Sequence, residues 1–564
     1  MSRIAWMLAM AVSALCAWVV AEERASRVVS TTQGPVRGYR RPHTSYYAFY
    51  SIPYATAPTG HQKFKAPLSP PTWEKIFDAK EEYIICPQNL MFMDMLQKDL
   101  NYKIKDDCLV INVFMPEKII NNLPVYVFVH GGGFQFGFGN MFNHTALIES
   151  GQIVVVNFNY RLGAHGFLCL GTEDVPGNAG MKDQVAALQW VKRNIANFGG
   201  NPDDVTLAGN SAGAAAAELL LLSKSTRGLF NKVIPESGSG AGVWAVQSKP
   251  LDIAKSYARL EGYKGVEDVF ALEKFYKDLP FEQLQKNYFM DNKDNTMGFV
   301  PCIERKDSEY PFLTEAPTSI ISKGDYEKLP LLVGFADMEG MSRLSFLEVW
   351  KEDMNENFSD FLPVDLHFNN DAEQQTAVRE IKEFYFGDQE ISAETALGFV
   401  NYISDVMFVY PAYRSVSLMA AAGSESLYLY LYAYPDEKLP GYPGVTGASH
   451  GTQSIALIDI ICGEKKQMKD SEDFNKVKKL LADVWQNFII KGDPTPPGSL
   501  AASALGTWRP MLAARPAHVL FNASSELRAE LWPDRMALWE RLYARHYRAP
   551  TPPPAPPTKT KTEL

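Results

Sequence analysis

Ser211 lies in a pattern that can make a serine hydroxyl reactive. The pentapeptide 209–213 (GNSAG) fits G-x-S-x-G, in which small residues two positions on either side of the serine permit a sharp turn. The same residues have a plainer interpretation, because Ser and Asn both cap helices and the alanine-rich run that follows favours a helix. The pentapeptide alone leaves both interpretations open, so the surrounding sequence has to decide.

A reactive serine needs a base to take its proton and an acid to orient that base. Where this pentapeptide joins a strand to a helix, the order along the chain is serine, acid, histidine. His450 is the favoured base because it lies in a loop of small residues, 447–451 (GASHG), that can approach another loop closely. The other histidines after Ser211 are His367, His518 and His546.

Two acidic residues compete for the role of the orienting acid. Glu339 and Asp337 both come shortly after the apolar run 329–333. Pattern alone leaves both open.

The sequence HGGGF at 130–134 offers backbone N–H groups for a developing oxyanion. Acyl transfer builds negative charge on a carbonyl oxygen, and fixed N–H donors stabilise that charge. The predicted donors are Gly132 and Gly133, joined by Ala212 directly after the serine. Glycine suits this place because no side chain blocks the approach of a substrate.

The elements that position these residues form an alternating pattern. Apolar runs at 123–129, 153–156, 205–208 and 329–333 predict buried strands, and 181–197 has the apolar spacing of a helix. Strands that alternate with helices indicate an α/β fold with a large, mostly parallel central sheet flanked by helices. In such folds the chemistry lies in loops at the carboxyl ends of the strands, where the candidate residues stand.

The composition of the chain limits the classes of partner that it can bind. The chain has 564 residues, 46% of them hydrophobic, and a formal net charge of −10. That charge argues against nucleic acid as a main partner. Without internal repeats or an internal linker, residues 22–548 are interpreted as one domain, and the chemistry above needs neither a metal nor an organic cofactor.

Both ends of the chain carry sorting features. The apolar run 4–20 predicts a secretory signal peptide over 1–21, and no other run is long enough for a stable membrane span. Residues 549–564 are predicted to be a disordered, proline-rich tail that ends in KTEL, Lys561–Leu564, which resembles the K-D-E-L retention signal. We expect the secretory pathway, ending either in secretion or in receptor-mediated retention in the endoplasmic reticulum lumen.

That route permits disulfides and glycosylation. The mature chain would keep five cysteines, an odd number, so at least one thiol stays free and the sequence alone does not fix the pairing. Three N-x-S/T sequons are compatible with glycosylation, at Asn143, Asn357 and Asn522.

Taken together, these motifs resemble the carboxylesterase/cholinesterase (type-B) family of α/β-hydrolases, and most closely its insect carboxylesterases of the antennal, odorant-degrading type. The landmarks run almost from end to end: HGGGF at 130–134, NYRLGAHGF at 159–167, GNAGMKDQ at 177–184, NPDDVTLAGNSAGA at 201–214 and GASHG at 447–451. The resemblance implies the α/β-hydrolase fold and a serine ester hydrolase that forms an acyl-enzyme.

Carried over residue by residue, the resemblance makes Ser211 the nucleophile, Glu339 the acid and His450 the base. It thereby selects Glu339 over Asp337. Cys86 and Cys108 match the family's first disulfide, whereas Cys169, Cys302 and Cys462 have no partner that the family implies.

Departures from the family pattern bear on the substrate. Most relatives carry Glu before the nucleophile, where this chain has Asn210, and residues 87–107 contain no Trp to hold a quaternary ammonium. Both departures argue against choline esters and favour small, uncharged, aliphatic esters, as in detoxification or the clearance of odorants or pheromones. Juvenile hormone esterase activity is an alternative, because those enzymes often carry a neutral amide before the nucleophile. Gln453 argues against it, because it stands where they tend to have an acid.

Two further alternatives remain. A non-catalytic adhesion protein on the same fold would usually lose the serine or the histidine, and a lipase would need an interface.

His165, within 159–167, replaces a usual apolar residue. It is interpreted as a packed histidine, with a role at the rim of the site as the alternative.

Overall fold

The computed structural model describes residues 25–90, 100–118, 120–286, 292–435, 441–460, 471–512 and 517–557. The predicted signal peptide, Cys462 and Lys561–Leu564 lie outside these residues.

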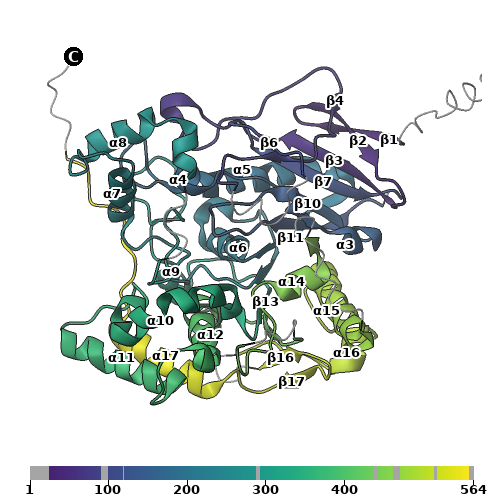
Figure 1. The fold of residues 1–564 in the computed structure, drawn as a ribbon. Helices are drawn as coiled ribbons and strands as arrows, with labels where there is room; N and C mark the ends of the chain where they lie inside the picture. Colours follow the sequence, from purple (N-terminus) through teal and green to yellow (C-terminus); the bar gives the residue numbers. More distant parts are fainter. Residues whose placement is uncertain are drawn as a thin grey trace, which may run out of the picture.

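The described residues form a central sheet of 13 strands. Pairing is parallel through the middle of the sheet, from the strand 154–158 to the strand 518–521. Towards both edges it is antiparallel, except that the short strand 77–78 runs parallel to its neighbour 34–40. This confirms the predicted large, mostly parallel sheet. Figure 1 shows the sheet descending from β1 at the upper right to β17 at the bottom. In sheet order, the strands are β1 (Ser26–Thr31), β2 (Gly34–Arg40), β3 (Tyr46–Pro53), β7 (Val110–Pro116), β10 (Val154–Phe158), β8 (Leu123–Val129), β11 (Gly200–Asn210), β12 (Lys232–Glu236), β13 (Leu331–Ala336), β14 (Leu427–Tyr432), β16 (His518–Phe521) and β17 (Glu526–Arg528), with β4 (Phe77–Asp78) beside β2.

The predicted strands are all present, with shifted ends. The prediction for 123–129 coincides with β8, whereas β11 begins five residues before the predicted 205. Its extra residues are polar, and they belong to the strand because Gly200 pairs with Leu123 of β8 across an irregularity in the register. An apolar run does not reveal such a strand end.

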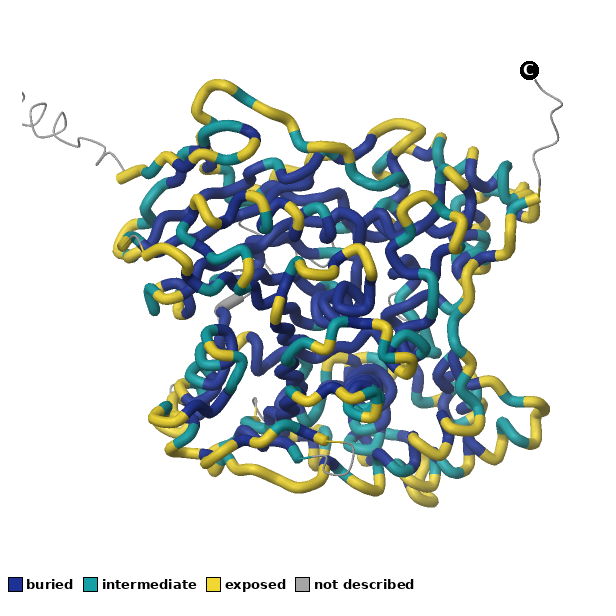
Figure 2. Tube along the Cα trace, turned by 180° about the vertical axis from the view of Figure 1, so that it is seen from behind, coloured by how far each residue is buried: buried dark blue, intermediate teal, exposed yellow. Residues whose placement is uncertain are grey.

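Apolar side chains cover both faces of the sheet. Along β8, Val125 and Val127 point into one hydrophobic cluster, and Tyr126 and Phe128 point into the other, as expected when successive strand residues face opposite sides. Helices α5 (Ala179–Asn194) and α6 (Ala212–Leu222) supply the first cluster, and α15 (Glu472–Lys491) supplies the second. In Figure 2 the interior of the chain trace is buried, and exposure concentrates at the periphery.

The helices surround this sheet on both faces (Figure 1). The helix predicted over 181–197 is α5, which ends earlier and continues as the 3₁₀ turn η3 (Ile195–Phe198). The described α-helices are α3 (Thr145–Glu149), α4 (Gly163–Phe167), α5 (Ala179–Asn194), α6 (Ala212–Leu222), α7 (Pro250–Leu260), α8 (Val269–Asp278), α9 (Pro317–Lys323), α10 (Leu347–Glu356), α11 (Asp371–Phe386), α12 (Ala396–Ser404), α13 (Tyr410–Ala421), α14 (Thr452–Leu457), α15 (Glu472–Lys491), α16 (Leu500–Leu505) and α17 (Pro533–His546).

The proline-rich segment differs in part from its prediction. Its described residues, 549–557, contain no helix or strand, but they are not detached from the protein: Pro553 is buried against Gly171 and Arg305, and the segment runs past α7 and α8 (Figure 1). Prolines fix an extended backbone at little further entropic cost, so few contacts suffice to hold it. Within the described ranges, none of the helices has the length and apolar character to cross a membrane.

Candidate active site

Ser211 occupies a strained turn between β11 and α6. Its backbone has φ 58° and ψ −122°, a conformation that costs a non-glycine residue about 1–3 kcal/mol. The turn is held by its N–H, which donates to the carbonyl of Glu236 at 2.8 Å. Close packing fixes it further, since a Cβ built on Gly213 would lie only 2.1 Å from the carbonyl oxygen of Val129.

His450 connects this serine to Glu339. Its Nε2 lies 2.9 Å from Ser211 Oγ, and its Nδ1 lies 2.5 Å from Glu339 Oε2. The side chain of Glu339 is fully buried and that of His450 is 20% exposed. Ser211, Glu339 and His450 are far apart in the sequence. The loops after β11, β13 and β14 bring them into one hydrogen-bonded chain.

The structure distinguishes the two acidic candidates by what each one contacts. Glu339 reaches the imidazole, and its other oxygen, Oε1, accepts hydrogen bonds from Ser237 Oγ at 2.6 Å and the N–H of Ala336 at 2.8 Å. Asp337 instead accepts a hydrogen bond from the N–H of Ala448 at 2.7 Å. Burial raises the pKa of Asp337 to about 6. Asp337 therefore holds the loop that carries His450.

The glycine loop after β8 lies against the serine. A Cβ built on Gly131 would stand 3.1 Å from the Cβ of Ser211, so the two backbones approach closely. The carbonyl of Gly132 accepts hydrogen bonds from the N–H groups of Gln135 and Phe136, which fixes the turn. The N–H groups of Gly132, Gly133 and Ala212 donate to no other residue in the described part of the chain, so they are available to a ligand.

Replacing Gly132 with alanine is expected to lower kcat by about 10²–10³-fold, the usual loss when one oxyanion donor is displaced. Gly132 has φ +109°, and the added Cβ would lie 2.0 Å from the carbonyl oxygen of Phe136, so the loop has to shift. Steady-state kinetics on a nitrophenyl ester measures the loss. Gly262→Ala is the matched control, because Gly262 has φ +83° but open space around it. Equal rates in both variants would contradict the assigned role of the loop.

Phe408 is a residue of the site that sequence reasoning missed. Its ring lies 4.3 Å from that of His450, centroid to centroid, and forms a wall beside the imidazole. It belongs to a π-helical turn, η9 (Asp405–Val409), between α12 and α13. Trp244 fixes this turn by donating its indole N–H to the carbonyl of Met407 at 2.7 Å. A π-turn leaves no simple sequence pattern, although such turns are frequent at functional sites.

Comparison with known proteins identifies the family of the chain. A family model described as "Carboxylesterase family" matches residues 25–539. The chain belongs to the carboxylesterase family. Among its relatives are Esterase FE4 of Myzus persicae, 31% identical over 79% of this chain and 81% of the relative, and Juvenile hormone esterase of Heliothis virescens, 33% identical over 85% and 87%. Esterase B1 of Culex pipiens is 30% identical over 92% and 98%.

A solved structure has the same fold as this carboxylesterase. Juvenile hormone esterase from Manduca sexta, with OTFP covalently attached, superposes with a TM-score of 0.80. It is 26% identical and covers 92% of this chain and 100% of that one. This match confirms the α/β-hydrolase fold.

In this carboxylesterase, Asn210 is buried beside the serine. Its Nδ2 donates to Ser454 Oγ of α14 at 2.9 Å, and a Cβ on Gly451 would lie 3.3 Å from the same amide nitrogen. The side chain thus connects the turn of Ser211 to the helix that follows His450. It also presents a neutral amide beside the serine.

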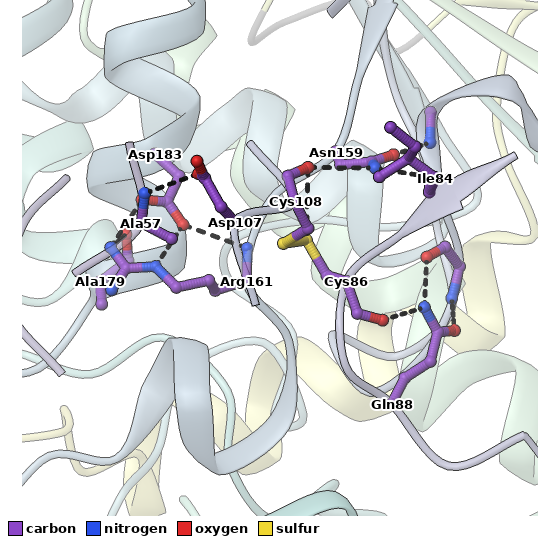
Figure 3. Close-up of a disulfide and its surroundings, with 12 residues drawn as sticks. Ala57, Ile84, Cys86, Gln88, Asp107, Cys108, Asn159, Arg161, Ala179 and Asp183 are labelled. Atoms are coloured by element: carbon purple, nitrogen blue, oxygen red, sulfur yellow. Dashed lines mark hydrogen bonds and ion pairs between the residues drawn. A yellow bond between two sulfur atoms is a disulfide. The ribbon is translucent and has the colours of Figure 1, made fainter. Parts of the chain in front are cut away.

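A disulfide between Cys86 and Cys108 borders the glycine loop (Figure 3). Gln88 links the disulfide to the chain that follows the glycine loop. Its side-chain amide donates to the carbonyl of Cys86 at 2.9 Å and to that of Gly137 at 3.0 Å, and it accepts from the N–H of Gly137 at 2.7 Å. The disulfide therefore helps to position the loop that contains Gly132.

A second disulfide joins Cys169 to Cys302, a pairing that the sequence left open. It holds the loop after α4 to a segment that follows α8. The partners are 133 residues apart in sequence, and no motif connects them.

His165 is a packed histidine in this structure. Neither ring nitrogen has a hydrogen-bond partner among the described residues, and the ring lies 4.9 Å from that of Phe281 and 6.2 Å from that of Phe64. Burial lowers its pKa to about 3. The ring is therefore neutral at physiological pH.

Replacing His165 with leucine is expected to remove part of the acid sensitivity of the fold. A histidine of the unfolded chain titrates near 6.5, so the fold loses stability as pH falls from about 6.5 towards the folded pKa of about 3. At pH 5 the loss from this residue is about 2 kcal/mol relative to pH 7.5. Urea unfolding of both proteins at the two pH values measures it. The control is His61→Leu, which removes an exposed histidine. If His165→Leu changed the pH dependence of stability no more than this control does, the explanation would be refuted.

The three sequons differ in exposure. Asn357 is exposed, whereas Asn143 and Asn522 are half-buried. Glycosylation stays a prediction at all three.

No group of three or more acidic, histidine or cysteine side chains suited to a metal occurs among the residues that the structure describes.

Proposed function

We propose that this protein is a serine carboxylic-ester hydrolase that works through an acyl-enzyme on small, uncharged, aliphatic esters. The observation that carries the proposal is the hydrogen-bonded chain from Ser211 through His450 to Glu339. Each link has the distance and atom types that activation of a serine by a neutral imidazole requires. The unused N–H groups beside the serine supply the oxyanion site.

Acylation begins when Ser211 Oγ attacks the ester carbonyl carbon and His450 Nε2 takes its proton. Glu339 accepts the Nδ1 hydrogen bond, keeps the ring in the tautomer that leaves Nε2 free, and stabilises the imidazolium. The N–H groups of Gly132, Gly133 and Ala212 stabilise the oxyanion of the tetrahedral intermediate. The carbon–alkoxide bond then breaks, and His450 returns the proton to the leaving alcohol.

Deacylation repeats these steps with water in place of the serine. His450 takes a proton from the water as it attacks the acyl carbon, and the same N–H groups stabilise the second oxyanion. Collapse releases the carboxylic acid and returns the proton to Ser211 Oγ. Each step uses groups of the chain and water.

The relatives support the reaction class. Those reported above carry esterase names, and the Manduca sexta enzyme has a covalently attached ligand. We propose that the natural substrates are odorant, pheromone or xenobiotic esters. A juvenile hormone esterase-like activity is the alternative. The neutral Asn210 beside the serine favours uncharged esters over cationic ones.

A panel of nitrophenyl and aliphatic esters, varied in acyl and alcohol length, tests the proposal. We expect turnover of short, uncharged esters and little of choline esters, with Ser211→Ala as the control. Background rates in both proteins would instead favour a non-catalytic, esterase-fold adhesion protein. Activity that rises only above the solubility limit of the substrate would indicate a lipase.

We also propose that the protein enters the secretory pathway. Two disulfides fit an oxidising lumen, and the signal peptide and the KTEL sequence stay predictions. Deleting Lys561–Leu564 and measuring the secreted fraction tests retention by a receptor in the endoplasmic reticulum. Unchanged secretion would contradict it.

A further inference from the structure

Glu236 is a fully buried acidic residue directly behind the catalytic serine. It ends β12 and pairs with Asn210 of β11, and its carbonyl accepts the N–H of Ser211. The mechanism above gives its side chain no role. A carboxyl group in this place needs an explanation, because burial of an unpaired charge is costly.

Its carboxyl group has donors for only one of its two oxygens. Oε2 accepts a hydrogen bond from the hydroxyl of Tyr430 at 2.5 Å, and that hydroxyl accepts one from the indole N–H of Trp485 at 3.2 Å. Oε1 has no partner among the described residues. No described Lys, Arg or His forms an ion pair with it.

Gln453 connects this carboxyl group to the catalytic acid. Gln453 lies close enough to Glu236 to lower the pKa of that carboxyl group, and its Nε2 donates to Ser237 Oγ at 2.5 Å. The hydroxyl of Ser237 in turn donates to Glu339 Oε1 at 2.6 Å. The Oε1 atom of Gln453 is buried and, like that of Glu236, has no donor in the described part of the chain.

We propose that Glu236 keeps its proton in the active enzyme and, through Gln453 and Ser237, is a positioning residue for Glu339. The proton supplies a donor where two buried oxygens have none. It also leaves Glu339 as the single negative charge of this buried group, since two neighbouring carboxylates would repel each other in a medium of low dielectric. This role rests on the proposed esterase function.

The groups around Glu236 predict an alkaline limit to activity. Burial, aided by the charge of Glu339, raises its pKa to about 8. Tyr430 on β14 and Tyr126 on β8 face it as neutral groups, because burial raises the pKa of both phenols well above the usual range. When Glu236 ionises, Gln453 loses its donor and turns towards the new charge, which releases Ser237 and with it Glu339. We therefore expect kcat to fall as pH rises through about 8.

The pH profile of kcat tests this role with Glu236→Gln, which keeps the size of the side chain and cannot ionise. The variant is expected to lose several-fold in kcat with little change in KM, and its alkaline limb should move up by more than one pH unit. Glu218→Gln is the matched control, because Glu218 is also buried and its pKa is also raised by burial, but its carboxyl bonds Ser415 of α13. An alkaline limb that stays in place in Glu236→Gln would overturn the proposal.

Infrared spectroscopy of the whole protein gives a readout that needs no catalysis. The difference spectrum between wild type and Glu236→Gln should contain the carbonyl stretch of one protonated carboxyl group at pH 6.5, and this band should disappear as pH rises through about 8. An identical spectrum in that variant would overturn the proposal even if ester hydrolysis is established. If instead the band behaves as expected and no ester is hydrolysed, the protonated Glu236 stands and the proposed function fails.

Discussion

Ser211→Ala should lower kcat for a short nitrophenyl ester by about 10⁶-fold, the scale seen when a triad nucleophile is removed. The substitution deletes the hydroxyl oxygen that His450 Nε2 contacts at 2.9 Å, so no acyl-enzyme can form. Water attack assisted by the oxyanion donors leaves a residual acceleration of about 10³-fold over the uncatalysed rate. Steady-state kinetics with active-site titration measures the loss.

The control for this variant is Ser503→Ala, which removes a hydroxyl from the exposed helix α16. It should retain the wild-type rate. Near-ultraviolet circular dichroism shows whether both variants keep the native packing. A folded Ser211→Ala protein with more than about one hundredth of the wild-type rate would contradict its role as the nucleophile.

Glu339→Gln should lower kcat by about 10⁴-fold with the fold preserved, because an amide disturbs the tautomer of the imidazole. Glu339 also accepts two hydrogen bonds on Oε1, from Ser237 and from the N–H of Ala336. An amide has one acceptor atom and must leave either the imidazole or this pair of donors unmatched. Comparing kcat and KM shows whether the loss lies in the chemical step.

Asp337→Asn is the informative comparison, since Asp337 competes with Glu339 on sequence grounds. An asparagine can still accept the N–H of Ala448, so the loss in kcat should be within about tenfold. A larger loss in Asp337→Asn than in Glu339→Gln would reverse the assignment of the acid.

Much of this fold was predictable because local pattern and tertiary structure agree. The apolar run at 123–129 became β8 without change, and the elbow at Ser211 stands between a strand and a helix as its glycines indicate. Its small-residue loop favours His450 as the base, and family resemblance favours Glu339 over Asp337 as the acid. In the structure Glu339 contacts the imidazole, whereas Asp337 accepts the N–H of Ala448.

Other parts depend on contacts that leave no local pattern. The pairing of Cys169 with Cys302, the wall formed by Phe408 and the link from Glu236 through Gln453 all join residues far apart in the chain. Pro553 shows the opposite case: composition predicts a disordered tail, whereas Pro553 in its described part is buried beside Gly171. Such features are decided by how surfaces meet after folding.

The most direct test of the acyl-enzyme mechanism is to trap the intermediate. Wild-type protein turning over p-nitrophenyl acetate is quenched in acid, digested and mapped by mass spectrometry. We predict one acetyl group on the peptide that contains Ser211, formed as fast as the burst of nitrophenol and missing in Ser211→Ala. Turnover without that acetyl group, or with the acetyl group on another residue at a competent rate, would contradict the account.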